Sequence, residues 1–223
     1  MRRSIAVVLV VAGSAVAIPV VANAAHKPGH GSPGGGNTPS IDIGARPDTT
    51  IFRGSTIISG RRRGADNANK VVTLRGDQYP FGGGSVVAST RTDNGGRYSF
   101  TRRPTKNTLY RVASGNLLSA LIRVNVRIRM SLVLSDYTPR VGQRVRFRGR
   151  ACPTHDGLTV KIQKRTATGS FRTIRRTRLR PARRCSIYSR RIRLFRDNTF
   201  RVTADDRDHA RGFSLTDTVN VHR

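Results

Sequence analysis

The sequence predicts an all-β fold in which two β-sandwich modules follow one another along the chain. Three observations support this fold class: short runs in which apolar and polar residues alternate, turn-forming residues between these runs, and an internal repeat. The composition agrees with it, because all 12 acidic residues are aspartate and few residues are long helix formers other than arginine.

Short strands are predicted wherever every second residue is apolar. Val145-Arg146-Phe147-Arg148 and Leu158-Thr159-Val160-Lys161-Ile162 would place apolar side chains on one face of a sheet and mostly polar ones on the other. The same pattern continues in Ser189–Leu194, Phe200–Val202 and Tyr98–Phe100. Turn residues separate the runs at Asp93–Gly96, Asp156–Gly157, Thr168–Ser170 and Asp197–Asn198.

The first 24 residues have the pattern of a secretory signal peptide. Arg2 and Arg3 precede an uncharged, largely apolar run from Ile5 to Val21, and Ala22-Asn23-Ala24 supplies small residues for cleavage. The alternative is an uncleaved membrane anchor. We expect cleavage, a secreted or cell-wall-associated product, and no transmembrane anchor in the mature chain. Residues 25–40 are rich in Gly, Pro and Ser and predict a disordered linker.

The remainder repeats itself at an interval of about 90 residues. Leu109–Val112 is matched by Thr199–Val202, and Val124–Val126 is matched by Val219–Val221. Upstream, Ser59-Gly60 parallels Arg148-Gly149. The repeat predicts a first module at residues 41–126 and a second at residues 127–223.

Three segments carry a resemblance to a known type of module: Thr92–Phe100, Asn107–Val112 and Val141–Gly149. They resemble the immunoglobulin-like or prealbumin-like β-sandwich modules that are strung together in secreted proteins of actinobacteria. The resemblance covers roughly residues 41–223, and its motifs are structural. It implies two tandem immunoglobulin-like domains with a scaffold or adhesive role, and it names no ligand.

The two cysteines, Cys152 and Cys185, predict one disulfide in an exported chain, because oxidising compartments favour the bridge. The alternative is a pair of free, buried thiols. A cofactor is not expected.

The sequence supplies no recognisable catalytic or metal centre, and we expect the protein not to be an enzyme. Cys152 and His155 form one pair of soft ligands without a second pair at zinc spacing. Asp205–Asp208 could ligate calcium but is better explained as a solvated hairpin loop. A spatial cluster of His155, His209 and an aspartate in a cleft would revive the enzymatic alternative.

Charge is the strongest functional signal. The chain has 42 Lys and Arg residues, 37 of them Arg, and a net charge of +30. Residues 127–223 hold 25 basic and 7 acidic residues, against 14 and 5 in residues 41–126. Ten arginines are concentrated in about 20 residues and would form one basic face on adjacent strands: Arg172, Arg175, Arg176, Arg178, Arg180, Arg183, Arg184, Arg190, Arg191 and Arg193.

A basic face of this kind predicts attraction to anionic cell-wall polymers, and the expected function is a non-enzymatic scaffold or adhesion protein of the cell envelope. The alternative for the charge is an arginine-rich codon supply that fills solvent-facing positions. The alternative function is a specific carbohydrate- or protein-binding module that uses loops 205–212 and 78–85. Another surface protein is a possible partner. Few aromatic residues and no recognised motif argue against dedicated nucleic-acid readout.

Overall fold

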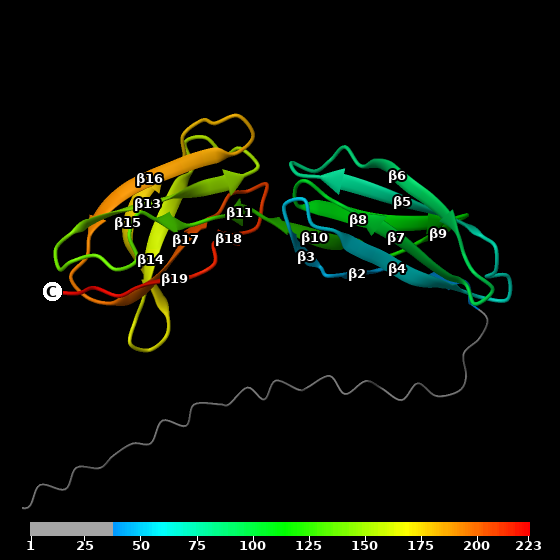
Figure 1. Cartoon of the computed structure of the whole chain (residues 1–223). Helices are drawn as coiled ribbons and strands as arrows, with labels where there is room; N and C mark the ends of the chain where they lie inside the picture. The colour runs from blue at the N-terminus through cyan, green and yellow to red at the C-terminus, as the bar shows by residue number, and fades with distance from the viewer. Residues whose placement is uncertain (1–37) are drawn as a thin grey trace, which may run out of the picture. The chain divides into compact units, whose positions relative to one another are not determined.

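The computed structural model describes residues 38–223, which form strands and connections and contain no helix (Figure 1). The all-β prediction is confirmed. The predicted signal peptide and all but residues 38–40 of the predicted linker lie outside the described residues. Within residues 38–223, no helix has the length and apolar character needed to cross a membrane.

The first ten strands form what we call the N-terminal sandwich. One sheet has the order β1-β4-β2, with β7 also paired to β4, and the other has the order β3-β10-β8-β5-β6, with β9 paired to β8. The strands are β1 (Ser40–Ile41), β2 (Gly44–Arg46), β3 (Thr49–Ile51), β4 (Thr56–Arg63), β5 (Val71–Gln78), β6 (Ser85–Arg91), β7 (Arg97–Arg102), β8 (Thr108–Ser114), β9 (Leu117–Leu118) and β10 (Ile122–Arg127).

The remaining nine strands form the C-terminal sandwich. One sheet has the order β11-β13-β12, with β16 also paired to β13, and the other has the order β15-β14-β17-β18, with β19 paired to β17. The strands are β11 (Arg129–Met130), β12 (Val133–Leu134), β13 (Arg144–Cys152), β14 (Thr159–Arg165), β15 (Phe171–Arg178), β16 (Ser186–Arg193), β17 (Asn198–Ala204), β18 (Gly212–Phe213) and β19 (Asp217–Val219).

The two sandwiches share one topology, and it is that of an immunoglobulin-like fold. In the N-terminal sandwich the last strand, β10, pairs antiparallel with β8 and parallel with β3. In the C-terminal sandwich β19 pairs antiparallel with β17, and a single parallel bridge joins Arg140 to His222 where β3 would be. In the N-terminal sandwich β5, β8 and β10 share one sheet while β4 and β7 share the other. In the C-terminal sandwich β14, β17 and β19 share one sheet while β13 and β16 share the other. This division of the strands is the immunoglobulin arrangement.

Each sandwich has its own hydrophobic core. Ile58, Leu74 and Val112 are fully buried in the cluster of the N-terminal sandwich. Phe147, Ile162 and Val202 are fully buried in the cluster of the C-terminal sandwich, where Phe147 contacts Phe200 edge to face with ring centroids 5.1 Å apart. The alternation along each strand therefore directs every second side chain into one of two cores.

A glycine and a tyrosine fix the same close contact in both sandwiches. The Tyr98 hydroxyl donates a hydrogen bond to the Asp42 carbonyl, and the Tyr188 hydroxyl donates one to the Ser131 carbonyl over 2.7 Å. A Cβ atom at Gly60 or Gly149, directly opposite these tyrosines, would collide with the same carbonyl and hydroxyl oxygens. Burial raises the pKa of both tyrosines, so the hydroxyls stay protonated donors at ordinary pH.

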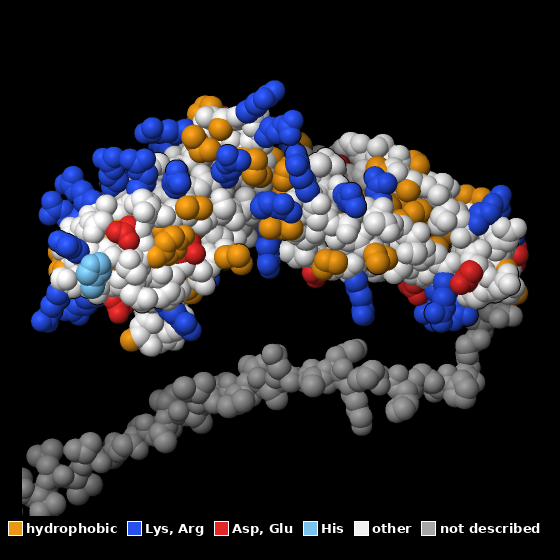
Figure 2. Space-filling view, in the orientation of Figure 1, with side chains coloured by type: hydrophobic (Ala, Val, Ile, Leu, Met, Phe, Trp, Pro, Cys, Tyr) orange, Lys and Arg blue, Asp and Glu red, His pale blue; other side chains and the backbone are white. Residues whose placement is uncertain are grey.

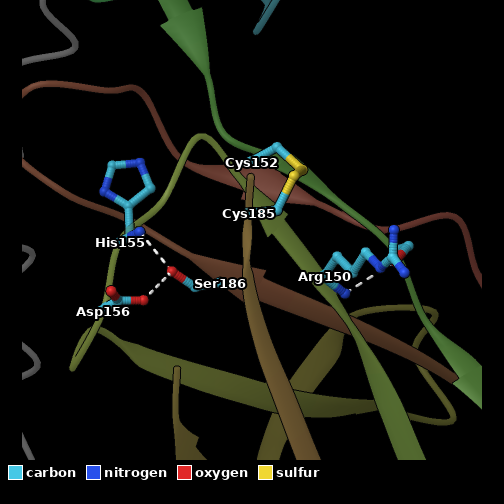
Figure 3. The surroundings of a disulfide bond; sticks show 7 residues. Arg150, Cys152, His155, Asp156, Cys185 and Ser186 are labelled. Carbon is cyan, nitrogen blue, oxygen red and sulfur yellow. Dashed lines mark hydrogen bonds between the residues drawn. A yellow bond between two sulfur atoms is a disulfide. The ribbon is translucent and has the colours of Figure 1, made fainter. Parts of the chain in front are cut away.

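The Cys152–Cys185 disulfide is present and confirms the predicted bridge (Figure 3). It joins the end of β13 to the residue before β16, closing a separation of 33 residues. Next to it, the His155 amide donates to the Ser186 hydroxyl over 2.7 Å, and this hydroxyl donates to the Asp156 carboxylate over 2.5 Å. The bridge and these two bonds together hold the turn that follows β13 against the start of β16.

Substitution Gly149→Ala is expected to lower the free energy of unfolding by about 1 to 3 kcal/mol, because the added methyl group separates β13 from the Ser131 carbonyl. Urea denaturation measures the change. Gly83→Ala is the control, since a Cβ there would contact nothing within 4 Å. Equal stability of both variants would contradict the close-contact assignment.

Replacing both cysteines by alanine is expected to cost about 3 to 4 kcal/mol in the loop-entropy model. The loss should be confined to the C-terminal sandwich, which holds the bridge. Amide hydrogen exchange measures it: protection should fall in β13 and β16 and stay unchanged in β4 and β7. Equal loss of protection in both sandwiches would show that the bridge stabilises more than its own core.

Candidate functional site

All ten arginines of the predicted basic face are exposed, but they do not share one sheet face. Strand β15 pairs with β14, whereas β16 pairs with β13 in the opposite sheet. The expectation that these arginines lie on adjacent strands is therefore wrong, because the chain passes from one sheet to the other between them. Four lie on β15 (Arg172, Arg175, Arg176, Arg178), three in the connection (Arg180, Arg183, Arg184) and three on β16 (Arg190, Arg191, Arg193).

A different set of arginines does share one face. Arg144, Arg146, Arg148 and Arg150 are the exposed residues of β13, because Val145, Phe147 and Ala151 point into the core. Arg191 and Arg193 are exposed on the paired strand β16, on either side of the buried Ile192. We call these six residues the arginine ladder. Arg190 lies opposite the core residue Phe147 in the strand register and is not part of it.

The ladder places like charges directly opposite each other. Arg144 is the register partner of Arg193, and Arg146 is the partner of Arg191. Directly opposed like charges destabilise a sheet. Among residues 38–223 no carboxylate lies within ion-pair distance of a ladder guanidinium, and no hydrogen bond from one is found.

Three cations on or beside the opposite sheet do have partners. Lys161 Nζ lies 3.2 Å from Asp205 Oδ1, and Arg211 contacts the other oxygen of the same carboxylate at 3.3 Å. The Arg201 guanidinium lies 4.0 Å from the Phe171 ring centroid and 4.6 Å from that of Phe213, and its Nε donates to Gln163. Opposed cations also occur on that sheet, where Lys161 lies opposite Arg176 and Lys164 opposite Arg172. What distinguishes the ladder is that its six side chains are all arginines on one face of two paired strands.

Two shallow surface hollows lie along the ladder. One is lined by Arg144, Arg146, Arg148 and Arg191 together with Leu134 and Ser135. The other is lined by Arg146, Arg148 and Arg150 with the apolar side chains Val133 and Ile187. Figure 2 shows Lys and Arg side chains gathered over the part of the molecule where β13 and β16 run in Figure 1. The face can therefore meet several anionic groups at once.

The N-terminal sandwich provides an internal comparison. Its strands β4 and β7 correspond to β13 and β16 through the matching Gly60–Tyr98 and Gly149–Tyr188 pairs. At the positions of Arg146 and Arg191 it has Ile57 and Thr101, and at those of Arg148 and Ser189 it has Ser59 and Ser99. Opposed arginines occur there as well, at Arg61 and Arg97, but the continuous ladder belongs to the C-terminal sandwich.

The loops of the alternative function have different surroundings. Loop 205–212 contacts the N-terminal sandwich: the Asn107 amide donates to the Asp208 carbonyl over 2.9 Å, and Lys106 Nζ lies 3.5 Å from Asp208 Oδ2. Loop 78–85 lies beside a surface hollow that includes Gln78, Phe81 and Tyr110. Two glycines of this loop are held in place, because Asp77 accepts hydrogen bonds from the Gly82 and Gly83 amides.

His155, Asp208 and His209 form a cluster that their spacing in the sequence did not predict. One donor atom from each lies within 4.8 Å of the others. The cluster is not in an open cleft, because the His155 and His209 side chains are 5% and 0% exposed. Burial lowers the pKa of His155, and His209 adds to the effect, while Asp208 and Asp206 oppose it.

The pKa of Asp208 responds to the same neighbours. Burial raises it, but the interactions with His209, His155 and Lys106 outweigh burial and bring it below its ordinary value. Asp208 is therefore ionised near neutral pH. The cluster pairs this carboxylate with two imidazoles.

No protein-family model and no curated protein matches this sequence. Solved structures with a similar chain path include a tetra-tandem repeat from the extending region of a large adhesion protein. Its sequence identity is 14% and its TM-score is 0.37, and the match covers 82% of this chain and 49% of that one. The teleost fish polymeric Ig receptor ectodomain gives 10% identity and a TM-score of 0.35, covering 82% and 98%.

The D0-D1 domain of intimin gives 8% identity and a TM-score of 0.32, covering 81% of this chain and 97% of that one. The chain thus spans about half the length of the adhesion-protein repeat. At these identities and TM-scores the likenesses say nothing about what this chain binds. The actinobacterial and prealbumin-like parts of the sequence resemblance stay predictions.

Removing one arginine of an opposed pair is expected to stabilise the protein. Arg191→Thr should raise the free energy of unfolding by about 0.2 to 1 kcal/mol at low salt, because Arg146 loses a like charge directly opposite. The gain should shrink in 0.5 M NaCl through screening. Arg148→Thr, which lies opposite Ser189, should give a smaller gain. Urea denaturation of the three proteins at both salt concentrations checks this, and a loss of stability in Arg191→Thr would contradict it.

Proposed function

We propose that this protein is a non-enzymatic, adhesion-type scaffold of the cell envelope whose C-terminal sandwich binds anionic polymers through the arginine ladder. The single observation that carries the proposal is the register of β13 and β16, which opposes Arg144 to Arg193 and Arg146 to Arg191 without a carboxylate partner. A polymer with regularly spaced negative charges would relieve this repulsion along the whole ladder.

Comparison of the two sandwiches supports a surface selected for binding. It argues against the alternative that an arginine-rich codon supply simply filled exposed positions with arginine. Both sandwiches are encoded in one chain, yet the central outward positions of the N-terminal sandwich hold Ile57, Ser59, Ser99 and Thr101. A general substitution of arginine into exposed positions would have filled both faces alike. The difference is local, as expected for a binding surface.

The shape of the ladder suits a flexible polymer better than a small molecule. Its six side chains stand along two strands, with only shallow hollows between them. Successive outward residues on a strand lie about 6.6 Å apart, a spacing at which several phosphate or carboxylate groups of one chain can be contacted together. The disulfide supports a location in an oxidising compartment, as an exported protein requires.

The experiment compares binding of soluble polyphosphate by the wild type and by a variant with Arg144, Arg146, Arg191 and Arg193 changed to Thr. A second variant changes Arg172, Arg175, Arg183 and Arg184 to Thr and has the same net charge. The wild-type affinity should fall linearly in a plot of log affinity against log salt. The ladder variant should have a slope shallower by about 3, since each lost phosphate contact removes about 0.7 to 0.9.

The charge-matched variant distinguishes the ladder from the overall charge. We expect it to retain most of the wild-type affinity. Equal weakening of both variants would mean that binding follows the net charge of +30 and not the ladder. Unchanged binding by the ladder variant would refute the proposal.

A second candidate function rests on the hollow beside loop 78–85. It combines Phe81 and Tyr110 with polar groups from Gln78 and Arg103, a mixture that suits an uncharged sugar. Binding at this hollow should be insensitive to salt. Titration with a neutral polysaccharide such as dextran at about 50 and 500 mM salt tests it, with Phe81→Ala as the variant and Phe195→Ala as the control.

A further inference from the structure

Two loops of the C-terminal sandwich meet at the histidine cluster. His155 lies between β13 and β14, and Asp208 and His209 lie between β17 and β18. Their side chains bring two ring nitrogens and a carboxylate oxygen within 4.8 Å of one another. The disulfide and the bond from the His155 amide to Ser186 hold the first loop in place.

Hydrogen bonds fix which nitrogen of His209 carries a hydrogen. His209 Nε2 lies 2.7 Å from the Thr105 carbonyl oxygen, which can only accept, so Nε2 must donate. The neutral ring then has a lone pair on Nδ1. This atom lies 2.7 Å from the carboxylate oxygen Asp208 Oδ1, and two acceptors at this distance require a proton or a metal cation beside them.

His155 has the complementary arrangement. Its Nδ1 lies 3.2 Å from the carboxylate oxygen Asp206 Oδ2 and donates to it, which leaves the lone pair on Nε2. Nε2 is buried and has no hydrogen-bond partner among the described residues. An unpaired buried nitrogen is costly unless some other group satisfies it.

From these contacts we propose that His155 Nε2, His209 Nδ1 and the Asp208 carboxylate bind a zinc ion. One divalent cation would satisfy both lone pairs and the carboxylate, whereas a proton on His209 would leave His155 Nε2 unpaired. Two imidazoles and a carboxylate are zinc ligands. Magnesium and calcium prefer oxygen ligands and fit this set poorly.

The hydrogen bonds from the ring nitrogens that would not bind zinc match those of metal-bound histidines. Such histidines donate their second ring hydrogen to a carboxylate or a backbone carbonyl, which fixes the tautomer. His155 has Asp206 as this partner and His209 has the Thr105 carbonyl. Zinc bonds of about 2.1 Å imply ligand atoms about 3.4 Å apart. On binding, His209 Nδ1 and Asp208 Oδ1, now 2.7 Å apart, would separate by about 0.7 Å, while the loop of His155 would approach them by about an ångström.

The ion would hold two loops together, and its fourth position would be left to water, because the cluster supplies three protein ligands. Both rings are buried, and loop 205–212 is the part of the C-terminal sandwich that contacts Thr105, Lys106 and Asn107. Zinc would tie this loop to the disulfide-bonded turn at His155. It would thereby fix the surface that the loop presents to the N-terminal sandwich, while Lys106 at 3.5 Å from Asp208 Oδ2 opposes binding in part.

The test uses the full, oxidised chain after treatment with a chelator. Zinc retained after equilibrium dialysis and the shift in thermal midpoint are measured for the wild type, His155→Gln, Asp208→Asn and His222→Gln. The last is the control, because His222 is exposed. All four proteins keep His26 and His30, so any zinc held there is the same in each.

We expect the wild type and His222→Gln to bind one more zinc than His155→Gln and Asp208→Asn. At about 100 times the dissociation constant, zinc should raise their midpoints by roughly 5 to 10 °C, and magnesium should not. Asp206→Asn changes only the carboxylate that accepts the hydrogen bond from His155 Nδ1, and it should weaken zinc binding by about 10- to 100-fold.

Equal zinc binding by wild type, His155→Gln and Asp208→Asn would overturn the proposal, as would a wild type whose midpoint zinc does not raise. Two ligand variants are used so that the result does not depend on one variant folding correctly. His155→Gln keeps the hydrogen bond from His209 to Thr105, and Asp208→Asn keeps both imidazole rings. Polyphosphate binding by the ladder is independent of this result, because no ladder residue belongs to the cluster.

Discussion

The packing of one face of β13 and β16 into the core determines the functional surface on the other. Val145, Phe147 and Ile192 are buried, and the two-residue period of a strand then directs Arg144, Arg146, Arg191 and Arg193 to the opposite side. The strand register that aligns the core also aligns the arginines. A one-residue slip would relieve the repulsion but would expose Phe147, so the core holds the like charges together.

The sandwich can tolerate this repulsion because its stability comes from elsewhere. Phe147 and Phe200 pack in the buried centre, Gly149 allows β13 to approach the Ser131 carbonyl, and the disulfide closes the end of β13 against β16. Each of these contributions exceeds the fraction of a kcal/mol expected for an exposed like-charge pair. The cost of the ladder is therefore small beside what holds its two strands.

Local patterns in the sequence predicted the strands and the disulfide well. Strands follow from alternation between neighbouring residues, and the disulfide follows from there being only one pair of cysteines. The alternation of Val145, Arg146, Phe147 and Arg148 sufficed to place β13 and its outward face. Pairing between distant strands was not predictable in the same way: a dense run of arginines suggested that β15 and β16 were adjacent, and the crossing to the other sheet separated them. For the same reason the sequence could name His155, His209 and an aspartate only as a condition, since His155 lies on a different loop from Asp208 and His209.

The central claim is that the arginine ladder, and no other basic part of the chain, contacts an anionic polymer. Backbone amide chemical shifts recorded during a titration with polyphosphate test it residue by residue. The account predicts shifts centred on residues 144–150 and 187–193, with β15 and the connection at residues 179–185 changing less. Shifts centred on β15 and that connection, or spread evenly over both sandwiches, would contradict it.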